Sequence, residues 1–404
     1  MPDQLIPSRR GLSSDDPIFA LHGEAQARKA AGDSVVDATV GALLDDNGEL
    51  VVLQTVMDLW RELTALEVAP YAPIAGDPAY LRGLVQRHWP NLAEAGSACA
   101  TPGGSGALAV SLRTFLEPGQ ALLTAAPFWG PYGILAAEAG MRLVTAPWPE
   151  AGRALDLAAW RREAEALMAA QGRLLVWLND PCHNPTGRSL SATDRAGLAA
   201  LLTELAGRGP VTLLLDLAYQ DYTREPAEVA AALADYAALG AAGSVLVGAS
   251  LSLSKALTLY GARSGALAFP WSRDGALQAA LSTACRGLWS NCPKAPQSLF
   301  VRMMRDGKAQ AHLAAEHRHW SEVLDARALA LDAALRVEGL EGALWQGGFF
   351  VTLGVSDPFG VSERMKAEGV FSVPMSWGLR VGLCGLRVVD APRFAQALGK
   401  ARVR

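Results

Sequence analysis

The strongest constraint on the fold of this chain is a regular alternation, from about residue 98 to residue 270, of short apolar runs with longer amphipathic stretches. The apolar runs lack polar positions at every second residue, which is typical of strands buried on both faces. The stretches between them are rich in Ala, Leu and Arg, and several begin with Asp, Ser or Pro, as helices do. Apolar strands separated by helices indicate an α/β fold with a mostly parallel sheet and helices on both faces.

We predict strands at Ala121–Leu123, Arg142–Val144, Leu174–Leu178, Val211–Leu215, Val245–Val247 and Gly265–Phe269, and helices at Leu157–Met168, Ser191–Leu205 and Pro226–Ala238. Pro293 and Pro296 interrupt this pattern, and a long helical stretch, Arg302–Leu335, follows them. Beyond it, Gly347–Leu353 and Leu379–Cys384 have the composition of strands in a smaller α+β unit.

The length of 404 residues corresponds to two or three domains at roughly 150 residues each. The first 45 or so residues have no sheet partner of their own, so we expect them to pack on the smaller unit. The predicted organisation is an N-terminal segment (1–50) packing with the small domain, a large ligand-binding domain (51–310) and a small C-terminal domain (311–404).

The charge and cysteine content exclude several classes of protein. Lys and Arg total 36 against 40 Asp and Glu, a net charge of −4, which argues against a nucleic-acid-binding or membrane-binding protein. The five cysteines include no C-x-x-C pair, so we expect neither a disulfide framework nor a metal site, and a reducing cytoplasm fits best. The N-terminus lacks the apolar region of a signal peptide. The uncharged stretch Tyr236–Ser254 contains three glycines, so we interpret it as a helix end, a buried strand and a polar loop.

Two ionisable residues follow predicted strands, where α/β sheets bind ligands. Lys255 lies in SLSLSKALTLYGARSG and is the only lysine between Lys29 and Lys294. A lysine attacks a carbonyl only when it is deprotonated, and the nearby Arg263 would favour the neutral amine. Asp216 ends VTLLLD, where a buried carboxylate needs a cationic partner, and a protonated pyridine nitrogen is one such partner. The alternatives are a surface lysine and an Asp that caps a helix or binds a metal.

Other motifs contain turn-forming or anion-binding residues. Asn184 in CHNPTG is either part of a turn only or the donor of a fixed amide to a cofactor oxygen. The glycine-rich TPGGSGAL precedes a helix and offers backbone N–H groups to a phosphate, although it matches no standard nucleotide motif. Hydroxyls and a cation suited to the same phosphate come from Ser252, Ser254 and Arg263.

Three further residues have both a structural and a functional interpretation. Trp129 could stack on a flat ring, and Tyr219 lies three residues beyond Asp216, but each could equally be a core aromatic. Arg380, within the apolar GLRVGLCG, requires a paired anion if it is buried, from either the protein or a substrate.

Together these motifs resemble the fold-type-I aminotransferases, which depend on pyridoxal phosphate (PLP), and specifically their aspartate/aromatic branch. The resemblance rests on the order of TPGGSGAL, PFWGPY, CHNPTG, DLAYQDY, SLSKALTLYGARSG and LRVGLCG. It extends upstream to VDATVGALLDDNGE and YAPIAGDP, and so covers roughly residues 36 to 385. Six motifs in one order are far more specific than any one of them.

The resemblance implies a role for each site residue. Lys255 would hold the cofactor as a Schiff base and act as the base, with Asp216 on the ring nitrogen and Tyr219 and Asn184 on the phenolic oxygen. The phosphate would be bound by Gly104, Ser105, Ser252, Ser254 and Arg263, and Trp129 would stack on the ring. Arg380 would bind the substrate α-carboxylate, with Gly41 and Phe350 beside the substrate. In a homodimer with shared active sites, Tyr71 would reach the neighbouring phosphate and Arg286 the neighbouring substrate side chain.

The implied activity is a ping-pong transfer of an amino group between an acidic or aromatic L-amino acid and a 2-keto acid. Departures from the family pattern lie near the substrate: Gly130-Pro131 after the stacking tryptophan, Cys292 within WSNCP, and Gly382 after Arg380. They bear on aspartate specificity more than on the PLP chemistry, and the two glycines suit bulkier substrates. The alternatives are another PLP reaction on this fold, such as a β-lyase or a decarboxylase, and a non-catalytic PLP-binding regulator.

Overall fold

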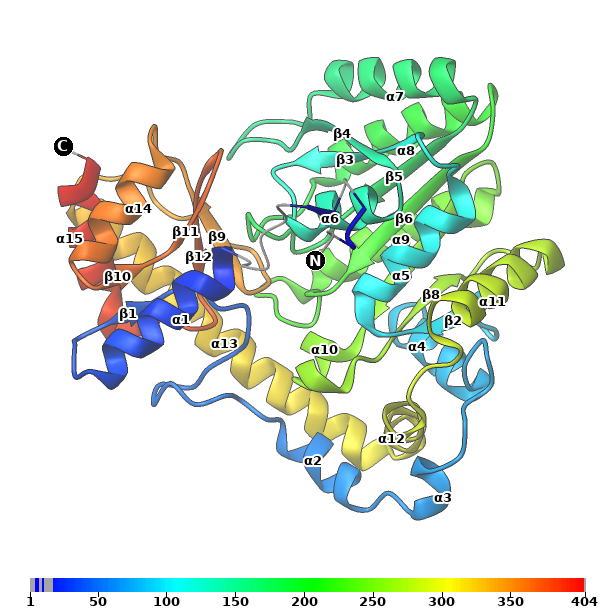
Figure 1. Cartoon of the computed structure of the whole chain (residues 1–404), viewed down its shortest axis with the longest axis horizontal. Helices are drawn as coiled ribbons and strands as arrows, with labels where there is room; N and C mark the ends of the chain where they lie inside the picture. Colours follow the sequence, from blue (N-terminus) through cyan, green and yellow to red (C-terminus); the bar gives the residue numbers. More distant parts are fainter. Residues whose placement is uncertain (1–3, 7–8, 11–16, 403–404) are drawn as a thin grey trace.

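The computed structural model of this protein describes residues 4–6, 9–10 and 17–402. Residues 1–3, 7–8, 11–16 and 403–404 lie outside the described residues. The first three ranges are part of the predicted N-terminal segment, and the prediction that this segment is not a signal peptide also falls on them. One part of the molecule is built around a seven-stranded sheet and the other around a three-stranded sheet. The 31-residue helix α13 (Gly307–Val337) runs along both parts (Figure 1).

The large sheet has the strand order β2-β8-β7-β6-β5-β3-β4. Its strands are β2 (Ser97–Thr101), β3 (Ala121–Ala126), β4 (Arg142–Pro147), β5 (Leu174–Leu178), β6 (Val211–Leu217), β7 (Leu246–Ser252) and β8 (Gly265–Phe269). Only β8 among them runs against its neighbours, β2 and β7. The predicted α/β fold with a mostly parallel sheet is therefore confirmed.

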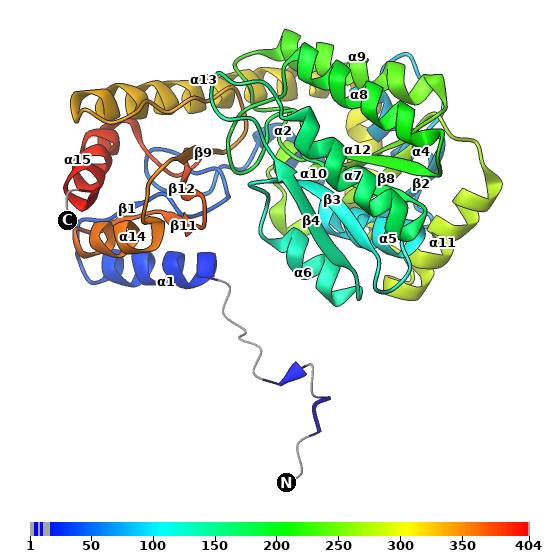
Figure 2. The same ribbon diagram turned by 90° about the horizontal axis from the view of Figure 1, so that it is seen from above.

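Helices cover both faces of this sheet (Figure 2). One face carries α7 (Leu157–Gln171), α8 (Ala192–Ala206) and α9 (Pro226–Ala242), and the other carries α5 (Gly103–Phe115), α6 (Pro131–Glu138) and α11 (Gly275–Trp289). Successive side chains of a strand enter opposite cores: Leu213 and Leu215 pack on one face and Leu214 on the other. Both faces of the sheet are buried under helices, which explains why the strand sequences are continuously apolar.

Several predicted boundaries were wrong because backbone pairing extends beyond the apolar run. Strand β6 continues to Leu217, since Asp216 pairs with Ser250 and Leu217 with Leu251. Strand β2 was not predicted at all, because SACAT consists mainly of small residues with weak strand preference. Strand β9 (Phe350–Leu353) starts later than predicted, because Gly348 has a φ of 82° and its N–H donates to the Tyr222 carbonyl.

The predicted long helix from residue 302 to 335 is two helices. Helix α12 (Lys294–Arg305) ends at Asp306, and α13 begins immediately after it. The Asp306 side chain accepts hydrogen bonds from the backbone N–H groups of Lys308 and Ala309, so it caps α13 and separates the two helices. Helices α2 (Gln54–Arg61), α3 (Ala65–Val68) and α4 (Pro78–His88) pack against α12.

The smaller part contains the antiparallel sheet β11-β12-β9, with β11 at Val373–Met375 and β12 at Gly378–Gly382. The predicted strand Leu379–Cys384 thus ends two residues early, because the chain turns where the Gly385 N–H donates to the Gly382 carbonyl. Helices α14 (Pro358–Ala367) and α15 (Ala391–Arg402) and the turn η3 (Val388–Asp390) complete this part.

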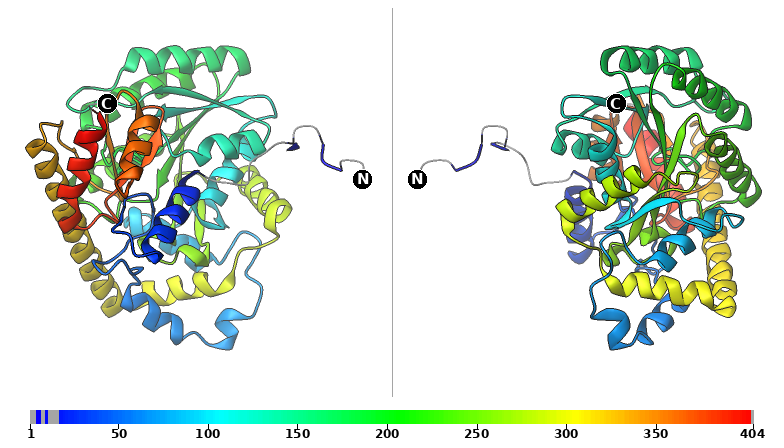
Figure 3. Two further views of the ribbon diagram at one scale, coloured as in Figure 1. Left: turned by 60° about the vertical axis from the view of Figure 1, so that its left-hand side comes forward. Right: turned by 90° about the vertical axis from the view of Figure 1, so that its right-hand side faces the viewer.

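Helix α1 and the segment that follows it lie against this smaller part (Figure 3). Strand β1 (Val36–Asp37) pairs in parallel with β10 (Val370–Phe371), and α1 (Pro17–Ala30) contacts both strands. The fully buried Arg327 of α13 donates to the carbonyls of Leu44 and Cys384 and to the Asp46 carboxylate. The division of the chain at residues 50 and 310 remains a prediction. Among the described helices, none combines the length and the apolar character needed to cross a lipid bilayer.

Candidate active site

The predicted site residues gather at the carboxyl ends of β5, β6 and β7, beside the N-terminus of α5. A cavity of about 180 Å³ lies there. Its lining contains ten predicted residues: Gly104, Ser105, Trp129, Asn184, Asp216, Tyr219, Ser252, Ser254, Lys255 and Arg263. Leu108, Asn179, Ala218 and Tyr260 complete the lining. Residues from five separate sequence motifs are thus brought to one small volume.

Lys255 lies in the short helix α10 (Leu253–Ala256), directly after β7. Its Nζ donates to the Gly41 carbonyl at 2.7 Å and lies 4.6 Å from the centre of the Tyr260 ring. Burial lowers the Lys255 pKa to about 8, and the charges of Arg263 and Arg380 act in the same direction. A lysine with this pKa is neutral in a substantial fraction of molecules near pH 8.

Asp216, in β6, faces the cavity and is 6% exposed. Burial raises its pKa to about 6, opposed by a hydrogen bond of 2.7 Å that the Tyr132 hydroxyl donates to Oδ2. Asn179, at the end of β5, donates from its side chain to the Asp216 carbonyl at 2.6 Å. Tyr132 and Asn179 were not among the predicted site residues, although each lies within five residues of one: Tyr132 three after Trp129 and Asn179 five before Asn184.

Asn184 and Tyr219 meet on the next wall of the cavity. Asn184 Nδ2 donates to the Tyr219 hydroxyl at 3.4 Å. The Asn184 backbone N–H is held by Asn179 Oδ1 at 2.6 Å, which fixes the turn. Asn184 Oδ1 is buried and has no hydrogen-bond partner among the residues that the structure describes. A buried acceptor without a partner costs stability, so this wall is suited to a ligand with a polar group.

The opposite end of the cavity is built to bind an anion. Helix α5 begins there, and Gly103 adopts a φ of 72° that lets the chain pass close to Arg263. Arg263 donates to the Ser254 hydroxyl at 3.1 Å, and the Ser252 hydroxyl caps α10 by accepting from the Ser254 N–H at 3.3 Å. N–H groups at a helix start, two hydroxyls and a guanidinium are the donors that a phosphate needs.

The predicted substrate residues lie beside the cavity. Arg380 of β12 is 3% exposed, and its Nη2 donates to the Thr39 carbonyl at 3.0 Å. Its guanidinium lies 4.3 Å from the centre of the Phe350 ring. A Cβ on Gly41 would lie 3.1 Å from the Phe350 ring, so a larger residue would crowd this contact. Because Lys255 Nζ binds the Gly41 carbonyl, this group adjoins the cavity.

The last two predicted residues, Tyr71 and Arg286, are exposed on the surface of their own chain. Tyr71 is 90% exposed. Arg286, in α11, is also exposed and donates to the Ser290 hydroxyl at 2.6 Å. Neither contributes to the cavity lining.

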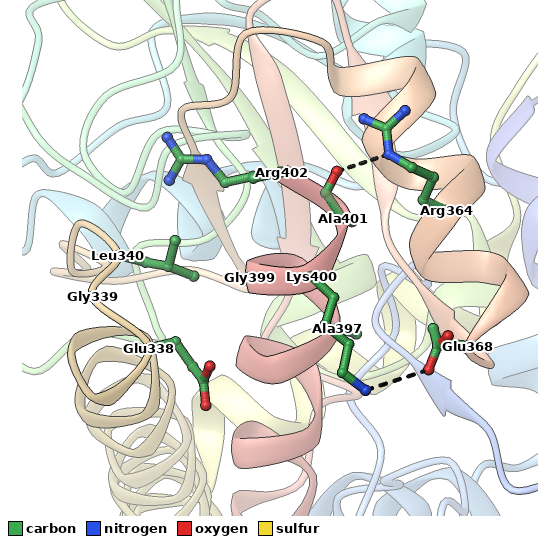
Figure 4. Close-up of a pocket in the computed structure, with 10 residues that line it drawn as sticks. All are labelled: Glu338, Gly339, Leu340, Arg364, Glu368, Ala397, Gly399, Lys400, Ala401 and Arg402. Atoms are coloured by element: carbon green, nitrogen blue, oxygen red, sulfur yellow. Dashed lines mark hydrogen bonds and ion pairs between the residues drawn. The ribbon is translucent and has the colours of Figure 1, made fainter. Parts of the chain in front are cut away.

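Larger hollows elsewhere contain none of the predicted residues. One of about 790 Å³ lies between the end of α13, α14 and α15, where Arg364 donates to the Ala401 carbonyl and Lys400 pairs with Glu368 (Figure 4). Another, of about 780 Å³, lies between the large and small sheets. In the described part of the chain, no group of three or more His, Cys, Asp or Glu side chains could hold a metal ion.

Comparisons with known proteins agree with this geometry. The family model for aminotransferase class I and II matches residues 33–398. A tyrosine aminotransferase of Rhizobium meliloti (strain 1021) is 26% identical over 401 residues, which cover 95% of this chain and 96% of the relative. An aromatic-amino-acid aminotransferase of Pseudomonas aeruginosa is 28% identical over 406 residues, with coverage of 95% and 96%.

Solved structures share the whole fold. The crystal structure of an aminotransferase from Anaerococcus prevotii matches with a TM-score of 0.92 and 25% identity, covering 100% of both chains. The family match spans nearly the whole chain and includes every cavity-lining residue. This chain therefore belongs to the class I and II aminotransferases, a family of PLP-dependent transferases.

Proposed function

We propose that the protein transfers an amino group between an acidic or aromatic L-amino acid and a 2-keto acid by a ping-pong mechanism. The observation that carries this proposal is that Lys255 and Asp216 line the same small cavity. The Lys255 amine has a lowered pKa and the Asp216 carboxylate is buried. Both properties are typical of groups that act on a bound ligand. The names of the relatives support aromatic substrates in particular.

The residues of the cavity match the functional groups of PLP. The unpartnered Asn184 Oδ1 and the Tyr219 hydroxyl suit a ring hydroxyl, and Asp216 suits a ring N–H. Gly104 keeps the space open, because a Cβ there would lie 3.2 Å from Ser250 Oγ and 3.9 Å from Asp216 Oδ1. An amine, a carboxylate and an anion-binding end together match the aldehyde, the pyridine nitrogen and the phosphate of this cofactor.

In this proposal each predicted residue of the cavity has a role toward PLP. Lys255 would hold the aldehyde carbon, Asp216 the ring nitrogen, and Asn184 with Tyr219 the phenolic oxygen. Trp129, which lines the cavity, would cover a face of the ring. The phosphate would be held by the start of α5 at Gly104 and Ser105 and by Ser252, Ser254 and Arg263.

When bound, PLP supplies an electron sink that acidifies the Cα–H bond of an attached amino acid. The chain's own residues do the rest. Arg380 binds the substrate α-carboxylate in a bidentate ion pair, which orients the substrate Cα. Gly41 and Phe350 limit the space around the substrate. Lys255, once free, takes the Cα proton and returns it on the cofactor side. Its pKa of about 8 leaves roughly a tenth of the amines neutral at pH 7, against almost none for an ordinary lysine.

We also propose a homodimer in which Tyr71 and Arg286 serve the site of the other copy. Tyr71 belongs to a stretch of exposed apolar side chains, with Leu66 at 83% exposure, Val68 at 46% and Ile74 at 41%. Exposed apolar surface of this kind is typical of a face that binds another protein.

The five cysteines are all buried and unpaired, in keeping with the cytoplasm as the location of the protein.

Steady-state kinetics test the proposed reaction. With amino acid and keto acid both varied, a ping-pong enzyme keeps kcat/KM for the amino acid independent of the keto-acid concentration. Product analysis should find keto acid and new amino acid in equal amounts. Pyruvate released together with ammonia would instead identify a β-lyase and contradict the proposal.

The Arg286→Ala variant tests substrate selectivity. If Arg286 binds the side-chain carboxylate of an acidic substrate, its loss should lower kcat/KM for aspartate by about 10- to 100-fold, the value of a hydrogen bond to a charged group. Values for tyrosine should stay within about twofold. Arg113→Ala removes another exposed arginine, one bonded to the carbonyl of residue 109 in its own helix, and serves as the control. An equal loss on all substrates would assign Arg286 to the interface alone.

A further inference from the structure

Tyr132 is buried in the large domain and lies against Asp216. It is 1% exposed, and its hydroxyl donates to Asp216 Oδ2 at 2.7 Å. Its ring is fixed on three sides: Trp177 packs edge-on at 5.0 Å, Trp129 edge-on at 5.8 Å, and Phe128 in parallel at 6.3 Å between ring centres. The hydroxyl therefore has one available position, at the carboxylate.

The two oxygens of the Asp216 carboxylate have different surroundings. Oδ2 accepts from Tyr132, whereas Oδ1 lies 3.9 Å from the position of a Cβ on the cavity-lining Gly104. Burial raises the Asp216 pKa to about 6, and the Tyr132 hydrogen bond is what opposes that rise. Lys255 and Tyr219 are the other titratable groups that line this cavity near Asp216, together with Tyr260 and Arg263.

A phenol is suited to this position because its O–H donates to Asp216 Oδ2. Burial and the neighbouring carboxylate raise the pKa of Tyr132 well above its ordinary value, so the hydroxyl keeps its proton at every working pH. A donor that keeps its proton favours the ionised form of Asp216.

We propose that Tyr132 is a positioning residue for the cofactor: its hydroxyl holds Asp216 with Oδ2 occupied and Oδ1 presented to a protonated ring nitrogen. The proposal rests on the proposed function, since it takes PLP as the ligand. It predicts that the contribution of Tyr132 to affinity exists only for a ring that carries an N–H. A purely structural tyrosine would support any ligand of the same shape.

The test compares two ligands in Tyr132→Phe, which keeps the ring and removes the hydroxyl. The ligands are PLP and its carbocyclic analogue, in which CH replaces the ring nitrogen. The dissociation constant for PLP should rise about tenfold, the effect of one hydrogen bond to a charged group, while that for the analogue changes less than twofold. Equal weakening of both ligands, or no weakening of either, would overturn the proposal.

A second buried tyrosine provides the matched control. The Tyr236 hydroxyl donates to Asp180 at 2.6 Å, and neither residue lines the cavity. Tyr236→Phe should leave the dissociation constants for PLP and the analogue within twofold of their original values. Wild-type protein that fails to bind PLP on Lys255 would contradict the proposed function itself, so the two failures are distinguishable.

A measurement on an intact phenol removes any dependence on the folding of Tyr132→Phe. With 3-fluorotyrosine placed at position 132, the ¹⁹F resonance of the apo-protein should titrate with Asp216, near pH 6. Bound PLP should abolish this titration, because the ring N–H keeps Asp216 ionised, whereas the carbocyclic analogue should leave it in place. A resonance that titrates identically in both complexes would contradict the proposal.

Discussion

Lys255→Ala should still fold and should lose essentially all transfer of amino groups, with kcat lowered by at least about 10⁴-fold. This is the upper end of what general-base catalysis alone contributes, and the variant also loses the covalent anchor for the cofactor. The physical reason is the position of Nζ, which is the one amine in the lining of the cavity and has a pKa lowered to about 8.

Borohydride reduction followed by peptide mass spectrometry measures the anchor directly. In the wild-type protein, PLP should be trapped on Lys255 alone, and in Lys255→Ala it should not be trapped at all. Lys308→Ala, which removes an exposed lysine at the start of α13, is the control and should behave as wild type. Turnover near the wild-type rate in Lys255→Ala would refute the assignment.

Asp216→Ala should still bind PLP but lose about 3–5 kcal/mol of transition-state stabilisation, the cost of deleting one partner of a buried charge pair. In kcat this is a loss of between about 10²- and 10⁴-fold. Single-turnover kinetics at saturating PLP separate this effect from weaker cofactor binding. An unchanged kcat would mean that Asp216 does not contact the ring nitrogen.

The same carboxylate should cost the apo-protein stability. Its pKa rises from 3.8 to about 6 on folding, so the folded state binds the proton more tightly than the unfolded state. The resulting penalty is absent below about pH 4, grows up to about pH 6 and stays constant above it, at about 3 kcal/mol.

Asp216→Asn should therefore stabilise the apo-protein by about 2–3 kcal/mol at pH 7.5, with the gain disappearing near pH 4. Urea unfolding of the apo-protein at both pH values measures this. A gain of the same size at pH 4 would show that the burial of the charge is not its cause. Catalysis and stability then oppose each other at one residue, as is common at active sites.

The sequence predicted the fold class and the cavity because each depends on local signals. Apolar strands without alternation mark a sheet covered on both faces. Asp216 lies near the end of one such strand, β6, and Lys255 lies just after another, β7. Tyr132 was missed for a physical reason: its hydrogen bond joins positions 84 residues apart, and nothing in PFWGPY distinguishes it from a core aromatic. Asn179 was also missed, because its side chain bonds to the backbone of Asn184 and of the distant Asp216, and the sequence shows neither contact.

Strand and helix ends were the weakest predictions, because hydrogen bonds decide them and hydropathy does not. Asp216 is polar and yet continues β6 by pairing with Ser250. Asp306 lies within a helical pattern and yet ends one helix and caps the next. In the proposed homodimer, Tyr71 and Arg286 would serve the cavity of the other copy, and the sequence of one copy does not show where that second copy lies.

The most direct test of the central claim is a half-reaction on PLP-loaded protein, with a panel of amino acids and no keto acid. The panel contains aspartate, glutamate, tyrosine, tryptophan and alanine. One class, acidic or aromatic, should yield one equivalent of keto acid per active site and convert the bound cofactor to pyridoxamine phosphate. Multiple equivalents of keto acid accompanied by ammonia, or no conversion by any amino acid, would contradict the account.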